Sequence, residues 1–140
     1  MLEYTMHANR GLARLLMEDD RVMLKLKVIQ PFDIEPMVLD GEVYRTGQGT
    51  HRRVISKAKD GSEYMDAGYN TYKKGTFFGA ITHPKDQICY VVSGEGEMGA
   101  DGEVFPLRAG MFTFHPAGIK CTFSCHTDMV TVCLFAPPRM

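Results

Sequence analysis

The sequence predicts an all-β protein, a sandwich or barrel of antiparallel strands preceded by a short helix at the N-terminal end. From Gly75 onward, short runs of strand-forming residues follow one another, and each run ends at a turn rich in Gly, Pro or Asp. No interval between these runs is long enough for a helix that would connect two parallel strands. We therefore expect antiparallel pairing throughout this half of the chain.

The first half of the chain is expected to add a helix and further strands. Apolar residues recur at helical spacing within residues 1–20, and they alternate with other residues from Val22 to Val28, which predicts a strand. Met37–Arg45 is typical of a hairpin that turns at Asp40-Gly41, and Asp60-Gly61 predicts a second hairpin turn.

The second half is expected to hold six strands. Asp101-Gly102 marks a tight hairpin between two of them. The expected strands are Ile88–Ser93, Glu97–Gly99, Val104–Leu107, Met111–His115, Cys121–Cys125 and Val130–Phe135.

The composition argues against several classes of function. A chain of 140 residues is the length of one domain, and its net charge of −1 disfavours nucleic acid as a main partner. No apolar run reaches the ~18 residues that a membrane-spanning helix needs, so we expect no membrane partner. Residues 1–16 include charged side chains and lack the apolar run of a secretory signal, which favours the cytoplasm.

The four cysteines support the same compartment. Cys89, Cys121, Cys125 and Cys133 show no C-x-x-C spacing, and a small secreted scaffold would be richer in cysteine. Cys121 and Cys125 share one face of their expected strand at roughly 13 Å, too far apart for a disulfide. We therefore expect four free thiols.

Two motifs in the second half resemble those of the cupin superfamily. The family's first motif, G-x5-H-x-H-x3/4-E-x6-G, matches the spacing of Gly75–Gly94, and its second, G-x5-P-x-G-x2-H-x3-N, matches that of Gly110–Cys125. The resemblance implies a double-stranded β-helix, the jelly-roll barrel of cupins, as one domain over residues 1–140. Residues 1–70 would supply the helix and additional strands, and residues 71–140 the barrel core.

The metal-binding positions of the family are altered in this sequence. Carried over residue by residue, they fall on Ile81, His83, Gln87 and Cys121, so one family ligand of four is kept. The site therefore holds either no metal or a single divalent ion such as Zn or Cu, bound by His83, Gln87 and Cys121.

Metal-free chemistry is a second interpretation of the same residues. An imidazole in a mostly apolar cavity has its pKa tuned near neutrality, which suits His83 as the acid and base of an isomerase, lyase or cyclase. Cys121 is a candidate nucleophile if His83 lies within reach as its base. His115 and His126 are expected at the surface or rim, because each adjoins a turn.

Binding of a small polar metabolite inside the barrel is the expected function, and turnover is left open. The alternative is a binding or sensing module that has lost the metal site. Strand alternation predicts which side chains face the ligand. The expected lining consists of Phe77, Ile81, His83, Gln87, Cys89, Cys121 and Phe123.

Two surface features complete the expectations. Positive charge gathers from His51 to Lys59, which predicts a solvated strand edge. Alternatively, since Arg52 and Arg53 face opposite ways on a strand, one of them reaches the barrel mouth and favours a carboxylate or phosphate. The resemblance also implies a homodimer, to which a strand at Arg21–Ile29 would contribute.

Overall fold

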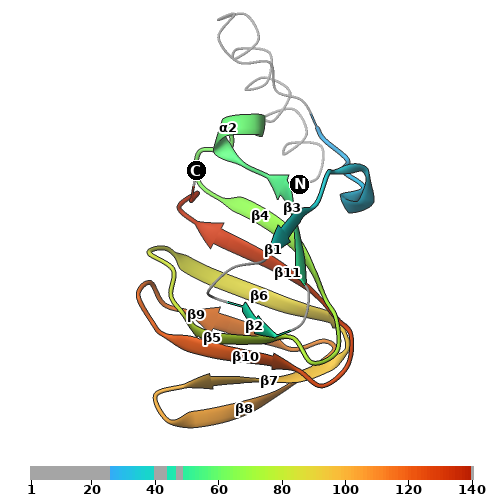
Figure 1. Cartoon of the computed structure of the whole chain (residues 1–140). Coiled ribbons are helices and arrows are strands. Elements are labelled where there is room, and N and C mark those ends of the chain that lie inside the picture. Colours follow the sequence, from blue (N-terminus) through green and yellow to red (C-terminus); the bar gives the residue numbers. More distant parts are fainter. Residues whose placement is uncertain (1–25, 40–43, 47–48, 140) are drawn as a thin grey trace, which may run out of the picture.

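Two antiparallel sheets make up most of the described part of the protein (Figure 1). The computed structural model describes residues 26–39, 44–46 and 49–139. The six-stranded sheet has the order β1 (Met37–Leu39), β3 (Gly49–Ile55), β4 (Asp66–Tyr72), β11 (Met129–Ala136), β6 (Asp86–Ser93) and β9 (Phe112–His115). The five-stranded sheet has the order β2 (Tyr44–Thr46), β5 (Phe77–Ile81), β10 (Cys121–Cys125), β7 (Glu95–Ala100) and β8 (Glu103–Arg108).

The core lies between the sheets because their strands alternate buried and exposed residues. In β11, Met129, Thr131, Cys133 and Phe135 are buried, whereas the residues between them are half-buried or exposed. This period of two is what a strand with one face on the core requires. The main apolar cluster joins residues of both sheets, namely Phe78, Val91, Leu107, Phe123, Cys125 and Met129.

Two of the predicted turns are confirmed. Asp101 and Gly102 both have positive φ and join β7 to β8, which pair along their whole length. At Asp60-Gly61 the connection between β3 and β4 contains one helical turn, α2 (Lys57–Asp60). Ser56 caps this turn by accepting a hydrogen bond from the Lys59 N–H, and Gly61 ends it in the left-handed region.

The hairpin predicted at Asp40-Gly41 is wrong. β1 pairs with β3 in one sheet, whereas β2 pairs with β5 in the other, so the strands on either side of this turn separate. A turn signal in the sequence marks a change of direction, but it does not say which partners the flanking strands take. The chain therefore passes from one sheet to the other between β1 and β2.

The predicted N-terminal helix over residues 1–20 lies outside the described residues. Of the strand predicted from Val22 to Val28, the described part is not a strand, and Leu26 and Val28 are more than nine-tenths exposed. The helices of the described part are η1 (Pro31–Asp33) and α2, and neither has the length and apolar composition needed to cross a membrane.

The expectation of four free thiols is wrong for one pair. Cys89 and Cys133 lie directly opposite each other on β6 and β11, with their Cα atoms 4.2 Å apart, and form a disulfide. Cys121 and Cys125 are free and buried. The sequence could not reveal the pair, because strand register brings together residues that are 44 positions apart. The argument from free thiols for a cytoplasmic location therefore does not apply to Cys89 and Cys133.

Candidate functional site

A cavity of about 490 Å³ lies between the two sheets, and both sheets contribute to its walls. This volume falls in the range of sites that hold small organic molecules. The six-stranded sheet presents many polar groups to it, and one register row places His51, Asn70 and Thr131 side by side. The five-stranded sheet faces this wall with mostly apolar side chains, including Phe78, Met98, Leu107 and Phe123.

The predicted lining needs one correction, at Phe77. Ile81 pairs with Cys121 and Phe78 pairs with Phe123, so β5 has two residues between these pairs where β10 has one. This β-bulge reverses the alternation of side chains along β5, and Phe78 rather than Phe77 lines the cavity. The Phe78 ring stacks on Phe123, with ring centroids 5.2 Å apart. The other predicted residues all line the cavity, namely Ile81, His83, Gln87, Cys89, Cys121 and Phe123.

His83 lies in the cavity wall just beyond the end of β5. Its ring meets that of Phe135 edge to face, with centroids 5.0 Å apart. Burial, and to a smaller extent the charge of Arg139, lowers the pKa of His83 below its ordinary value. The imidazole is therefore neutral at pH 7, with a lone pair available to accept a proton.

His115 is a buried member of the cavity wall, which corrects the prediction that it lies at the surface or rim. It is the inward-facing residue of β9 opposite Gln87 on β6. Its Nδ1 lies 3.6 Å from Cys121 Sγ and its Nε2 lies 2.8 Å from Thr113 Oγ1. Burial, and less strongly the nearby His83, lowers the pKa of His115.

The surroundings of Cys121 favour the neutral thiol. Burial, with a smaller effect of Asp101, raises the pKa of Cys121 above its ordinary value. A thiol with a raised pKa is a weak nucleophile at neutral pH. The imidazole within hydrogen-bonding reach of this thiol is that of His115, whereas His83 had been the expected partner.

The donor set does not fit a divalent metal. At the four motif positions, Ile81 offers no lone pair and Gln87 is uncharged, so only His83 and Cys121 are of the types that commonly hold a transition metal. The described residues contain no group of three His, Cys, Asp or Glu side chains placed to share an ion. We therefore derive no chemistry through a metal at this site.

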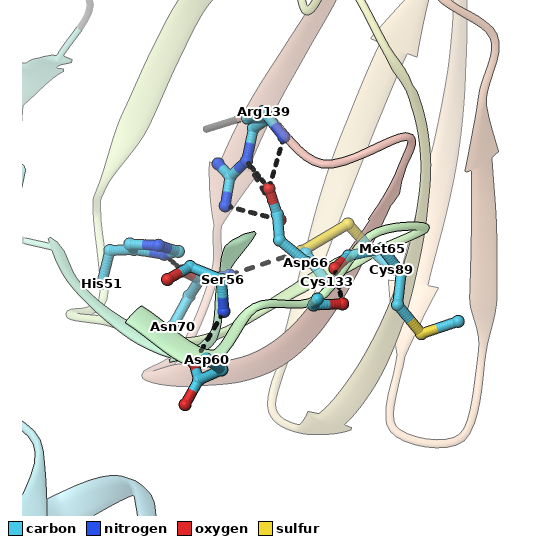
Figure 2. Close-up of polar contacts among 10 residues, drawn as sticks. His51, Ser56, Asp60, Met65, Asp66, Asn70, Cys89, Cys133 and Arg139 are labelled. Atoms are coloured by element: carbon cyan, nitrogen blue, oxygen red, sulfur yellow. Dashed lines mark hydrogen bonds and ion pairs between the residues drawn. A yellow bond between two sulfur atoms is a disulfide. The ribbon is translucent and has the colours of Figure 1, made fainter. Parts of the chain in front are cut away.

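A basic region occupies the part of the cavity formed by β3 and the C-terminal segment. Arg53 and Arg139 line the cavity, whereas Arg52 faces the other side of β3, where its guanidinium lies 4.8 Å from the centre of the Phe32 ring. Arg139 is held by Asp66, to which its backbone N–H and guanidinium both donate (Figure 2). Of the two expectations for this run of charge, the structure supports an arginine that reaches the cavity, and that arginine is Arg53.

His51 was assigned to a solvated edge, but the structure places it in the cavity wall with 6% of its surface exposed. Its Nδ1 lies 2.6 Å from Asn70 Oδ1, and the Asn70 amide donates to Cys133 Sγ (Figure 2). The same amide group also donates to Thr131 Oγ1. The strand alternation that places Arg53 inward also places His51 inward, two residues earlier. This parity was the available signal for His51. By contrast, His126 is exposed, as its position in a turn predicted. Its Nε2 lies 2.9 Å from Glu97 Oε1.

The chain belongs to the cupin family. Residues 68–137 match the family described as Cupin domain, and this match spans both motifs. The surrounding fold, with its two antiparallel sheets around a lined cavity, agrees with that match. None of the curated proteins compared with this chain matches its sequence significantly.

Solved structures with the same fold include several enzymes. A predicted oxalate decarboxylase from Thermotoga maritima is 19% identical with a TM-score of 0.69, covering 79% of this chain and 98% of that protein. The polyketide cyclase RemF from Streptomyces resistomycificus is 16% identical with a TM-score of 0.69, covering 81% and 83%. Ectoine synthase from P. lautus is 25% identical with a TM-score of 0.66, covering 81% and 79%. At these low identities, the likeness to the first two shows a shared fold alone.

Proposed function

We propose that this cupin binds a small carboxylate-bearing metabolite inside its barrel and moves a proton on it without a metal. The observation that carries the proposal is the charge of the cavity wall. Arg53, Lys85 and Arg139 line the cavity together with three histidines, and no Asp or Glu is among its described lining residues. A cavity with this lining is poorly suited to a cationic ligand and attracts an anionic one.

The ion pair of Arg139 with Asp66 leaves this argument intact. Asp66 is almost fully buried and balances the charge of Arg139, whereas Lys85 adds a positive charge to the cavity wall. An arginine guanidinium offers two parallel N–H donors that match the two oxygens of a carboxylate. The apolar wall opposite would accommodate the carbon skeleton of the same molecule.

Proton transfer is the chemistry that the neutral histidines support. His83 faces the cavity as a neutral base, and Cys121 and His115 form a further hydrogen-bonded pair nearby. This arrangement suits an isomerase, lyase or cyclase, each of which removes a proton at one place and returns one at another. Solved structures with this fold include a polyketide cyclase and ectoine synthase, so the barrel supports enzymatic sites in other proteins.

The test of binding is a calorimetric titration with small carboxylates, each paired with its primary amide. We expect the carboxylates to bind and the amides to bind at least ~10-fold more weakly, because the amides lack the charge that Arg53 recognises. Arg53→Gln should remove this difference. Arg52→Gln is the matched control, because Arg52 occupies the next position of β3 but faces away from the cavity. Equal binding of carboxylates and amides would contradict the proposal.

The alternative is a binding or sensing cupin without turnover, and the loss of three metal-ligand positions favours it. The two functions are separated by following each bound carboxylate by NMR in the presence of the protein. An enzyme converts or exchanges protons on the ligand, and His83→Ala abolishes the conversion while the fold persists. A binding module leaves the ligand unchanged, and His83→Ala alters only affinity.

A metalloenzyme with His83, Gln87 and Cys121 as ligands was the third expectation from the sequence. Elemental analysis of untagged protein, repeated after dialysis against a mild chelator, tests it. A stoichiometric metal that disappears in His83→Ala would contradict the metal-free proposal.

We further propose that the chain forms a homodimer through the outer face of the six-stranded sheet. Six large apolar side chains of β6, β9 and β11 are exposed on that face: Ile88, Tyr90, Val92, Phe112, Phe114 and Leu134. They are neighbours in the sheet, since Ile88 lies between Phe114 and Leu134 and Tyr90 lies opposite Phe112. None of the six is charged, so two copies of the face meet without repulsion between like charges.

A further inference from the structure

We infer that Cys121, with His115 as its base, adds to the carbon–carbon double bond of a small α,β-unsaturated carboxylate held in the cavity. The inference rests on the proposed function, because it names the substrate class of the same cavity and a covalent step within it. It depends on three side chains of the cavity wall, those of Thr113, His115 and Cys121. Hydrogen bonds connect these side chains in series, and the series ends at the sulfur atom.

The contacts of His115 place a nucleophile, a base and an orienting group next to one another. His115 Nδ1 lies 3.6 Å from Cys121 Sγ, and His115 Nε2 lies 2.8 Å from Thr113 Oγ1. Burial raises the pKa of Cys121, so the thiol keeps its proton and donates it to Nδ1. Nε2 is then the protonated nitrogen of the neutral ring and donates to Thr113 Oγ1. This order of groups is the one that covalent catalysis by a thiol requires.

The fold holds the thiol and the imidazole at this distance. Thr113 and His115 are two positions apart on β9, so their side chains face the same side of the six-stranded sheet. Cys121 begins β10 in the other sheet. The connection from β9 to β10 turns at Gly118, which has a positive φ and donates its N–H to the His83 carbonyl. The reacting pair is therefore placed by two sheets and an anchored turn.

Cys125 provides a comparison on the same strand. It faces the same side of β10 as Cys121, but it belongs to the main apolar cluster and is not among the described residues of the cavity wall. Burial, with a smaller effect of Asp128, raises the pKa of Cys125 to about 12. Both thiols are free, so a difference in their reactivity reports what the cavity and the imidazole contribute to Cys121.

The charge of the ligand decides which of its carbons the thiol attacks. The proposed ligand is a carboxylate, and the carbon of an ionised carboxylate resists nucleophiles because its oxygens already carry negative charge. A double bond conjugated with the carboxylate offers an electrophilic β-carbon instead. Addition there moves negative charge toward the carboxylate, which the positive charge that Lys85 brings to the cavity wall favours.

The step balances with these residues and the ligand alone. As the bond between Cys121 Sγ and the β-carbon forms, the thiol proton moves to His115 Nδ1. The electron pair of the double bond moves onto the α-carbon and the carboxylate. The His115 imidazolium then gives its proton to the α-carbon, which leaves a thioether and a neutral imidazole. The reverse sequence restores the thiol and releases the ligand.

Acrylate is the probe for this step, and acrylamide is its uncharged counterpart. The native protein is incubated with each reagent at neutral pH, and the adducts are located by peptide mass spectrometry. We expect acrylate to label Cys121 at least ~10-fold faster than Cys125, because Cys121 has a base and lines the cavity. When each rate is divided by that of 2-mercaptoethanol with the same reagent, Cys121 should favour acrylate over acrylamide at least ~10-fold.

Variants of the two hydrogen-bonding partners test their roles. His115→Gln should slow the labelling of Cys121 about 100-fold, the size of a general-base effect. Thr113 is a positioning residue, so Thr113→Val should slow the labelling less, and Thr113→Ser should restore it by supplying a hydroxyl again. The labelling of Cys125 is the control in every variant, because a change that only loosened the fold would expose Cys125 as well.

A measurement on the wild-type protein keeps the inference testable if His115→Gln fails to fold. Long-range ¹H–¹⁵N NMR should show His115 protonated on Nε2 and unprotonated on Nδ1 at neutral pH. The opposite tautomer would overturn the inference, because Nδ1 would then be unable to take the thiol proton.

The outcomes separate this inference from the proposed function. Equal labelling of Cys121 and Cys125, or labelling of Cys121 that His115→Gln leaves unchanged, overturns the inference. A normalised preference for acrylamide overturns the substrate class and also counts against the proposed function. Propionate, the saturated analogue of acrylate, tests the proposed function alone. If propionate binds in calorimetry while Cys121 does not react, the inference fails and the proposed function stands.

Discussion

At the scale of single residues, His51, His83 and His115 are three imidazoles in the wall of one cavity, and each has a lowered pKa. Burial is the main cause for all three, because a charged imidazole loses its hydration there. Their neutral form is what allows them to accept protons or hydrogen bonds from a ligand. It also makes the fold sensitive to acid.

We expect the free energy of unfolding to decrease as the pH falls through about 6.5. The sign follows from linkage: the unfolded chain, with ordinary histidine pKa values, binds protons at a pH where the folded chain does not. The loss continues downward until the pH reaches the lowered pKa values of the folded state. Urea unfolding at several pH values measures it.

Two variants give the control for this pH dependence. His115→Gln removes one buried imidazole and should reduce the loss of stability between pH ~7.5 and ~5.5. His126→Asn removes an exposed imidazole that pairs with Glu97 and should leave most of the loss in place. Stability that rises on acidification over this range would contradict the assignment of three buried neutral histidines.

At the scale of secondary-structure elements, the β-bulge between β5 and β10 decides which phenylalanine faces the interior. Phe78 is 4% exposed and packs against Phe123 and Tyr72, whereas Phe77 is half-buried outside the cavity. The two residues are adjacent and have the same side chain. They therefore form a matched pair for measuring what the bulge does.

Phe78→Ala should destabilise the protein by about 3–5 kcal/mol, the cost of removing a large buried ring. Phe77→Ala should cost clearly less, because part of that ring remains in water in the folded state. Urea unfolding of the two variants measures the difference. Equal costs, or a larger cost for Phe77→Ala, would show that β5 has the unbroken alternation expected from its sequence.

The pairing of β6 with β11 makes a prediction about the cysteines. Unfolding the protein without reductant in the presence of iodoacetamide should label Cys121 and Cys125 and leave Cys89 and Cys133 unlabelled, as mass spectrometry would show. After reduction, all four should be labelled. Labelling of all four without reductant would restore the expectation of free thiols and the argument for a reducing compartment.

At the scale of the whole molecule, the apolar outer face of β6, β9 and β11 is large for a surface that meets only water. We expect wild-type protein to sediment as a dimer and Phe114→Lys to sediment as a monomer with an unchanged circular dichroism spectrum. Phe105→Lys is the control, because Phe105 is exposed on β8 in the other sheet. A monomeric wild type, or loss of the dimer in the Phe105 variant alone, would contradict this interface.

Most of the fold was predictable because local signals specify it. Turn residues mark the ends of β6 to β11, and apolar alternation identifies the buried face of each strand. Six of the seven expected lining residues follow from this alternation. The prediction that Phe77 lines the cavity was wrong, because a bulge adds one residue to β5 and the local sequence pattern does not reveal it.

The candidate site was less predictable because it depends on register. His115 at the end of β9 and Cys121 at the start of β10 meet although their strands belong to different sheets, and Cys89 meets Cys133 on the neighbouring strand. His51 looked like part of a charged surface run, since its sequence neighbours are basic. Only the pairing of β3 with β4 shows that Asn70 and Gly68 make a place for its ring.

By itself, the sequence determined the antiparallel β architecture, the two cupin motifs and the altered metal-ligand positions, because these follow from turn chemistry, periodicity and residue identity. The tertiary structure alone decided the disulfide, the burial of His51 and His115, and the gathering of Arg53, Lys85 and Arg139 around one cavity. These features arise when residues from distant strands share one register row or face each other between sheets. Strand register is a property of the whole sheet and decides which residues meet. The physical reason is geometric, because a shift of register by one residue turns every side chain of a strand to the opposite face.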